Sequence, residues 1–297
     1  MKQRGKISGK RFKQSFITYS FVLPDFIGLL IFIIIPIIYS FYMSFFNWNF
    51  ANIKEFIGVQ NYYTIFHDVA WWQSLLRTFK LTLLYVPTLF GFSIFLAVLI
   101  NYVKNERIAG FVKTAFLLPY SITSVIASCL WMFLYMDRTG YVNIFLKVIG
   151  IGEQKFLGST SQAMVCIAVV LIWINLGYNI ILFLSAIKDI PTSYYEAAQL
   201  DGASGWNIFW NITFPLLKPT SIFVLITSVI ASFQCLDLIM VMTSGGPAKS
   251  TEVASLYIYK QSFDMMRAGY GAALSVLMFL IMTVLAGIML KMNGKEE

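Results

Sequence analysis

Charged residues are scarce in this chain. Asp, Glu, Lys and Arg together make up 12% of its 297 residues, whereas an ordinary soluble domain contains roughly 25%. Hydrophobic residues make up 58%, which leaves few polar side chains to cover a surface in water. The composition therefore excludes an ordinary soluble domain and predicts a protein of the lipid bilayer.

Histidine and cysteine are also rare. His67 is the single histidine, which excludes a histidine-based catalytic triad and a metal site built from several histidines. The three cysteines lie in apolar stretches without paired spacing, so neither a disulfide framework nor a zinc site is predicted. A membrane-embedded enzyme would also need clustered nucleophiles or bases at membrane depth. Because the sequence has no such cluster, we expect neither enzyme activity nor a bound metal.

Long apolar stretches dominate the sequence. A helix needs about 20 mostly apolar residues to cross a bilayer, because its backbone groups must be satisfied within the helix. The first stretch follows basic residues, as in a signal peptide, but it is longer than the apolar region of one and is expected to remain as an anchor. Pro36, Pro87 and Pro119 predict kinks. The sequence predicts an all-α, polytopic membrane protein with six transmembrane helices, over residues 26–46, 81–103, 114–135, 163–186, 221–241 and 272–290.

The basic residues predict the orientation of the chain. A net charge of +8 is also typical of nucleic-acid-binding proteins, but the basic residues here gather at the ends of the apolar stretches. Several precede the first span, and Lys104, Arg107 and Lys113 lie between the second and third. The positive-inside rule then predicts that both termini are cytoplasmic. We expect a basic cytoplasmic tail over residues 1–15 and one membrane domain over residues 16–297, with no nucleic-acid partner.

The cytoplasmic connection over residues 187–219 is patterned as two short helices. Ser193 and Glu196 have the spacing of a capping box, which predicts a helix that begins there. Gly202 predicts its end, because glycine adopts the left-handed conformation without steric cost. Ser204 predicts the cap of a second helix that runs until Pro215.

The residues of this connection carry a family signature. Glu196-Ala197-Ala198 is followed after three residues by Gly202 and then, after nine intervening residues, by Ile212 and Pro215. This pattern resembles the EAA motif of bacterial ABC importer permeases, with Phe214 in place of the usual leucine. The chain most resembles the carbohydrate-uptake branch, related to the larger permease of the maltose importer but without its large extracytoplasmic insertion. Other similar segments are residues 116–119, 173–179, 190–219, 233–234, 236–239, 243–247 and 250–251.

The resemblance implies a set of partners in the bacterial cytoplasmic membrane. They are a second permease subunit that completes a heterodimer, two cytoplasmic ATPase subunits and an extracytoplasmic solute-binding protein. ATP and Mg would be bound by the ATPase, and no cofactor by this chain; the glycine-rich segment 245–250 lacks the glycine that precedes the lysine of a phosphate-binding loop. Glu196 either contacts the ATPase or only completes the capping box. The coupling residues implied by the resemblance are Tyr195, Glu196, Ala197, Ala198, Asp201 and Gly202.

A second group of residues is predicted to line the substrate pathway. Asp237 is the one charged residue inside a predicted span, where exposure to lipid would cost about 2.5 to 3.5 kcal/mol. Gln234 lies three residues earlier, on the same face of the predicted helix, and Ser232 is close by. This polar stripe predicts either a pathway that binds sugar hydroxyls or a network between packed helices. The resemblance adds Trp173, Asn175, Leu176 and Gly177 to the pathway.

The sequence predicts an ATP-driven importer of a di- or oligosaccharide. Glycerol 3-phosphate is the alternative substrate within the same family, but a phosphate calls for Arg or Lys in the pathway, and no predicted span contains either. An ion-coupled secondary transporter is a less favoured alternative, since one carboxylate within a span is compatible with it.

Overall fold

A computed structural model describes residues 21–51 and 54–293 of the chain. The predicted basic tail, residues 1–15, lies outside the described residues. The described chain is mainly helical, with a single pair of two-residue strands, and it forms two compact units. The all-α prediction is therefore confirmed. Of the described residues, one unit comprises 21–51, 54–67 and 261–277, and the other comprises 68–260 and 278–293.

The first unit contains a helix over Phe21–Met43. The helix widens into a π-helical segment, η1 (Leu30–Ile34), directly before α2 (Ile35–Met43). Pro36 lies inside this continuous helix, where its missing N–H group removes one backbone hydrogen bond. Asn61 of α3 donates to the carbonyl oxygens of Ser44 (2.8 Å) and Phe46 (3.1 Å) and so holds the strand pair against that helix. The other elements here are β1 (Phe46–Asn47), antiparallel to β2 (Glu55–Phe56), then α3 (Gln60–His67), η5 (Lys260–Asp264) and the start of α15 (Ala268–Asn293).

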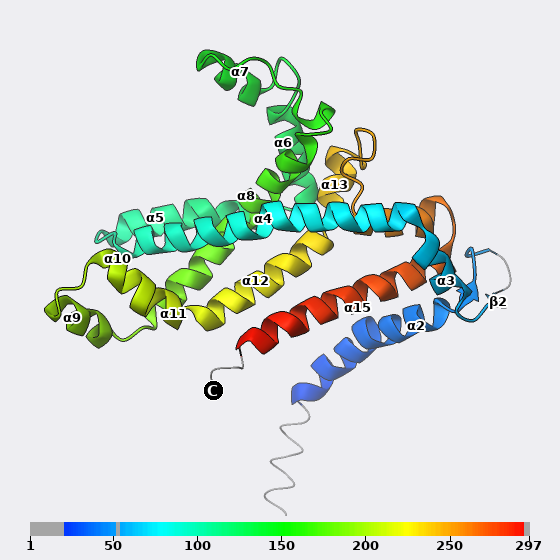
Figure 1. The fold of residues 1–297 in the computed structure, drawn as a ribbon, viewed down its shortest axis with the longest axis horizontal. Coiled ribbons are helices and arrows are strands. Elements are labelled where there is room, and N and C mark those ends of the chain that lie inside the picture. The colour runs from blue at the N-terminus through cyan, green and yellow to red at the C-terminus, as the bar shows by residue number, and fades with distance from the viewer. Residues whose placement is uncertain (1–20, 52–53, 294–297) are drawn as a thin grey trace, which may run out of the picture. The chain divides into compact units, whose positions relative to one another are not determined.

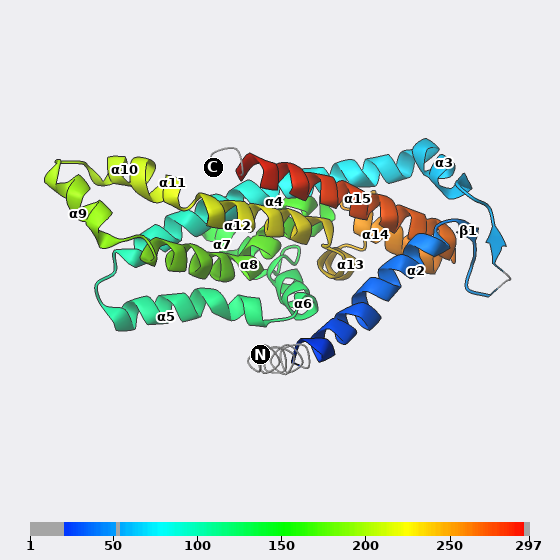
Figure 2. The same cartoon turned by 90° about the horizontal axis from the view of Figure 1, so that it is seen from below.

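The second unit is built on two long helices. α4 (Val69–Asn101) packs along α8 (Ala163–Lys188), and α5 (Glu106–Leu117) and α12 (Lys218–Phe233) pack against this pair (Figures 1 and 2). Asp68 caps α4 by accepting from the N–H groups of Ala70 and Trp71. The apolar faces of α4 and α8 form the core around Leu81, Leu89 and Ile167, all fully buried.

Two candidate spans of the structure are strongly bent. Residues Glu106–Ser121 and Ser124–Leu134 form helices at 103° to each other, and Gly205–Leu216 meets Lys218–Phe233 at 67°. Pro119 lies in the 3-10 segment η2 (Leu118–Ser121), directly before the first bend, where a missing backbone donor weakens the helix. Helix α4 by contrast continues through Pro87. The elements in and between these segments are α6 (Ser124–Leu134), α7 (Tyr141–Val148), η3 (Phe156–Gly158), α9 (Thr192–Leu200), α10 (Gly205–Ile208), η4 (Phe209–Thr213) and α11 (Phe214–Leu216).

The number of spans agrees with the sequence prediction, but some of their limits differ. Four described helices are long and apolar enough to cross a membrane, and six spans result if each bent pair counts as one. The second span begins at Val69 rather than at residue 81, so α4 includes Arg77 and Lys80. The fifth prediction, 221–241, is wrong as a single helix, because α12 ends at Phe233 and a separate helix, α13 (Asp237–Met242), follows; α14 (Ala254–Tyr259) comes after it.

Candidate translocation and coupling sites

A cavity with several polar side chains in its wall lies where α12 gives way to α13. Its volume is about 350 Å³, and three separate parts of the second unit contribute its walls. Asn175 comes from α8, Gln234 and Asp237 from the junction of α12 and α13, and Thr123 from the bend before α6. The complete lining is Tyr120, Ile122, Thr123, Ser124, Leu171, Ile174, Asn175, Ala231, Gln234, Cys235, Leu236, Asp237 and Leu238.

The break in the chain determines how Gln234 and Asp237 are presented. Gln234 ends α12, and its carbonyl oxygen accepts from the N–H group of Leu236 at 2.7 Å, which turns the backbone out of the helix. Asp237 then begins α13. The prediction that the two side chains share one helical face is therefore wrong, yet both are exposed and both line the same cavity.

Four other predicted pathway residues lie outside the lining of this cavity. Trp173 packs edge-to-face on Trp131 with ring centroids 5.7 Å apart, and Leu176 packs against the hydrophobic core. Ser232 is fully buried, with its hydroxyl oxygen 2.7 Å from that of Thr82 on α4. Gly177 is where α8 meets the backbone of Phe116, since a Cβ at this position would overlap the Phe116 carbonyl. These four residues lie in contacts between helices.

Helix α9, which carries the residues predicted to contact an ATPase, begins without a side-chain cap and ends at a glycine. The capping-box prediction is wrong: α9 begins at Thr192 after Pro191, without a side-chain cap, and Ser193 already lies inside the helix. The predicted end is confirmed, because Gly202 has φ +73°. The N–H groups of Ala203 and Gly202 donate to the carbonyls of Ala198 (2.9 Å) and Gln199 (3.1 Å), which is the Schellman pattern of a helix terminus.

One side of α9 packs against the rest of the chain, and the other side is exposed. Ala198 is buried, and the Tyr195 hydroxyl lies 3.2 Å from the hydroxyl oxygen of Thr213 in η4. Leu200 is 90% exposed, a large apolar side chain left outside the fold. The exposed surface also includes Glu196, Ala197, Asp201 and Gly202.

The segment after α9 contains a cluster of packed aromatic rings. Ser204 caps α10 as predicted, by accepting from the N–H group of Asn207. Trp210 packs on Trp206, Phe209 and Phe214 with ring centroids 5.7, 5.1 and 5.1 Å apart. Because these rings precede the bend into α12, they connect the surface around α9 to a helix that ends at the cavity.

Comparison with known proteins decides the family. Residues 62–293 match the family described as the inner membrane component of binding-protein-dependent transport systems. The chain belongs to this family. It is thus a multi-pass permease of an ABC transporter, a membrane component rather than an enzyme, and it functions in a system that includes a binding protein. ATP hydrolysis belongs to a separate subunit.

Relatives of this permease match it over nearly its whole length. The probable starch degradation products transport permease of Thermoanaerobacterium thermosulfurigenes is 30% identical, with 97% of each chain covered. A glycerol-3-phosphate transport permease of Agrobacterium fabrum is also 30% identical, over 96% of this chain and 97% of the relative. Among solved structures, a chain of a bacterial alginate ABC transporter in complex with its pentasaccharide-bound periplasmic protein is 27% identical, covers 96% of each chain and has a TM-score of 0.84.

Some residues of the permease's cavity were missed by the sequence prediction. Tyr120, Thr123 and Ser124 belong to the five residues directly after Pro119, four of which carry a hydroxyl group. A proline followed by such a run in an apolar span indicates a break whose polar groups need a partner or a cavity. Tyr120 also stacks on Tyr178 of α8, with ring centroids 4.8 Å apart and planes within 9° of parallel.

Proposed function

We propose that this permease carries a neutral di- or oligosaccharide. The observation that supports the proposal most directly is the chemistry of the cavity, whose lining combines amide, hydroxyl and carboxylate groups with a tyrosine ring. Such groups accept and donate hydrogen bonds to sugar hydroxyls. No Lys or Arg occurs among its described lining residues, and the Asp237 carboxylate disfavours a second anion in the cavity.

The charged residues of α4 do not change this conclusion. Arg77 donates to the side chain of Gln73 at 3.3 Å, and neither Arg77 nor Lys80 lines the cavity. Glycerol 3-phosphate remains the second candidate, because one relative that carries its name is as similar to this chain as the starch-product permease is. Binding a phosphate at this cavity would require cationic groups from another subunit.

The remaining parts of the proposal concern the partners. Two such permeases, this chain and a second, different one, enclose the pathway, and a pair of cytoplasmic ATPase subunits binds ATP and Mg. The exposed face of α9, with Glu196, Ala197 and Leu200, inserts into the ATPase, whose closure on ATP then moves the membrane helices as rigid bodies. In this arrangement both termini are cytoplasmic.

The test of the substrate is uptake into proteoliposomes that contain the complete transporter and its binding protein. Labelled maltose, maltotriose and glycerol 3-phosphate are compared for the native chain, Asp237→Asn and the control Asp264→Asn, which alters an exposed aspartate far along the sequence from the cavity. We expect uptake of an oligosaccharide that falls about tenfold in Asp237→Asn, the equivalent of one charged hydrogen bond, and is unchanged in Asp264→Asn. Uptake of glycerol 3-phosphate alone, raised by Asp237→Asn, would contradict the proposal.

A further inference from the structure

Helix α13 depends on the loop that follows it. With six residues, Asp237–Met242, it is shorter than two helical turns, and so short a helix is not stable by itself. Its last turn is bonded to the start of the loop: Thr243 Oγ1 donates to the Ile239 carbonyl at 3.1 Å, and Ser244 Oγ donates to that of Met240 at 2.9 Å. The other end of the helix carries Asp237 into the cavity.

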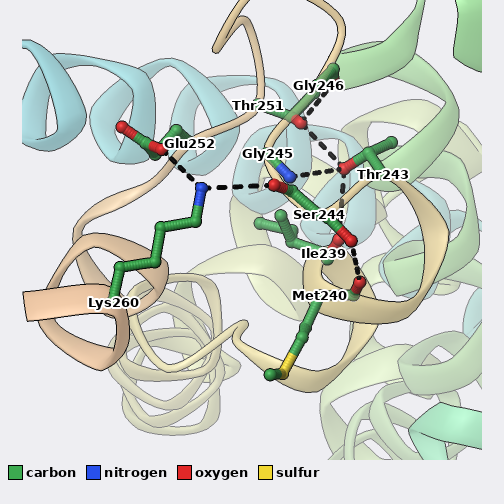
Figure 3. A network of polar contacts seen from close by, with 9 residues as sticks. All are labelled: Ile239, Met240, Thr243, Ser244, Gly245, Gly246, Thr251, Glu252 and Lys260. Atoms are coloured by element: carbon green, nitrogen blue, oxygen red, sulfur yellow. Dashed lines mark hydrogen bonds and ion pairs between the residues drawn. The ribbon is translucent and has the colours of Figure 1, made fainter. Parts of the chain in front are cut away.

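An ion pair closes this loop. Lys260 Nζ lies 2.7 Å from the Glu252 carboxylate and donates to the Ser244 carbonyl at 3.3 Å (Figure 3). The Glu252 side chain is 5% exposed and the Lys260 side chain 31%. One ammonium group thus joins the two ends of the segment 244–252, and one of those ends is bonded to α13.

The interior of the loop leaves little freedom around the ion pair. Thr251 Oγ1 donates to the Gly246 carbonyl at 2.7 Å and lies 2.8 Å from Thr243 Oγ1 (Figure 3). A Cβ on Gly245 would lie 3.2 Å from the Glu252 Cβ and 3.4 Å from Lys260 Nζ, and Gly245 has φ +89°. The glycine therefore serves both the turn and the close approach of the two charged side chains.

The far side of the loop is attached to α4. The Ala254 N–H group donates to Thr78 Oγ1 at 2.9 Å, and the Tyr257 hydroxyl donates to the Asp68 carboxylate at 2.6 Å. The segment that carries Glu252 and Lys260 is consequently fixed to the longest helix of the second unit. A connected set of bonds leads from α4 through the ion pair to α13.

We propose that Glu252 and Lys260 are positioning residues, whose ion pair holds α13 so that Asp237 stays in the wall of the cavity. Removal of the Lys260 charge leaves Glu252 without its partner and takes the donor from the Ser244 carbonyl, whereas neutralising Glu252 removes the carboxylate that fixes the Lys260 ammonium group beside Ser244. In both cases the short helix shifts as a unit and the junction at Cys235 opens. The effect on transport rests on the proposed function of the cavity, whereas the effect on its geometry does not.

The geometric test uses Cys235, which lines the cavity and is buried. In a Cys129→Ser/Cys166→Ala background, the assembled transporter in nanodiscs is treated with N-ethylmaleimide and the alkylation rate of Cys235 is followed by mass spectrometry. The variants are Lys260→Met and the isosteric Glu252→Gln, with Glu153→Gln as control, since Glu153 lies in an exposed pair with Arg138 at 3.9 Å. We expect alkylation about tenfold faster in the two test variants and unchanged in the control.

The positioning role is tested by a double-mutant cycle on sugar uptake. If the pair acts through Asp237, Glu252→Gln lowers uptake in the native background but has little further effect in Asp237→Asn, whereas a general loss of stability gives additive effects. Unchanged alkylation in both assembled test variants, or additive effects on uptake, would overturn the proposal. If Asp237→Asn alone leaves uptake unchanged, the proposal that the cavity carries sugar is wrong. The alkylation rates still test whether the ion pair between Glu252 and Lys260 holds α13 in place.

Discussion

Single residues in this permease differ in how far the fold constrains them. Glu196 is exposed on α9, and the structure leaves its side chain outside the helix cap that the sequence predicts. Gly177 is buried in a contact between helices. We therefore expect substitution of Glu196 to alter function without loss of stability, and substitution of Gly177 to alter stability first.

The first prediction concerns Glu196. Glu196→Lys reverses a charge on the exposed face of α9 and is expected to reduce substrate-stimulated ATP hydrolysis of the reconstituted complex by about tenfold or more, as for a charged contact across an interface. Glu106→Lys makes the same charge change at an exposed site in the first turn of α5 and should retain stimulation. Normal stimulation in an assembled Glu196→Lys complex would show that this side chain does not couple the subunits.

The second prediction concerns Gly177. Gly177→Ala puts a Cβ against the Phe116 carbonyl, and overpacking of this kind costs about 1 to 3 kcal/mol. The midpoint of thermal unfolding in detergent should fall. Gly110→Ala on α5 adds a Cβ with nothing within 4 Å and should be neutral or slightly stabilising, because alanine favours a helix. Equal midpoints of thermal unfolding for the two variants would mean that α5 can move away from α8 without loss of stability.

At the scale of an element, α9 is defined by its C-terminal end. Gly202 adopts a left-handed conformation in which other residues are strained by roughly 1 to 2 kcal/mol. We expect Gly202→Val to reduce stimulated ATP hydrolysis because the helix ends differently and its exposed face is misplaced. Gly202→Asn should retain most of it, since asparagine tolerates this conformation. A Gly202→Val complex as active as Gly202→Asn would indicate that the Schellman end is not needed.

At the scale of the whole molecule, the basic residues predict the orientation of the chain. Lys249 is exposed in the loop after α13, and Glu196 is exposed on α9. With both termini cytoplasmic, Lys249→Cys in a background without native cysteines should react with a membrane-impermeant maleimide added outside intact cells. Glu196→Cys should react only after the membrane is made permeable. The reverse pattern would contradict the proposed topology.

The sequence by itself determined the membrane class, the helical fold, the end of α9 and the start of α10. Each of these properties depends on a single stretch of chain. An apolar stretch of about 20 residues is long enough to span a bilayer as a helix. Gly202 ends a helix through its own backbone freedom, and Ser204 caps a helix through its own side chain. The family resemblance likewise depends on the order of residues. The matches to known permeases confirm it.

Only the tertiary structure decided where the cavity lies and which polar residues line it. Gln234 and Asp237 share a wall because α12 stops at Phe233, and Tyr120 and Asn175 join them from other helices. Ser232, just two residues before Gln234, faces Thr82 instead. The physical reason is that a break in a helix is stable only where partners distant in sequence satisfy the freed polar groups, and those partners appear only when the helices have packed.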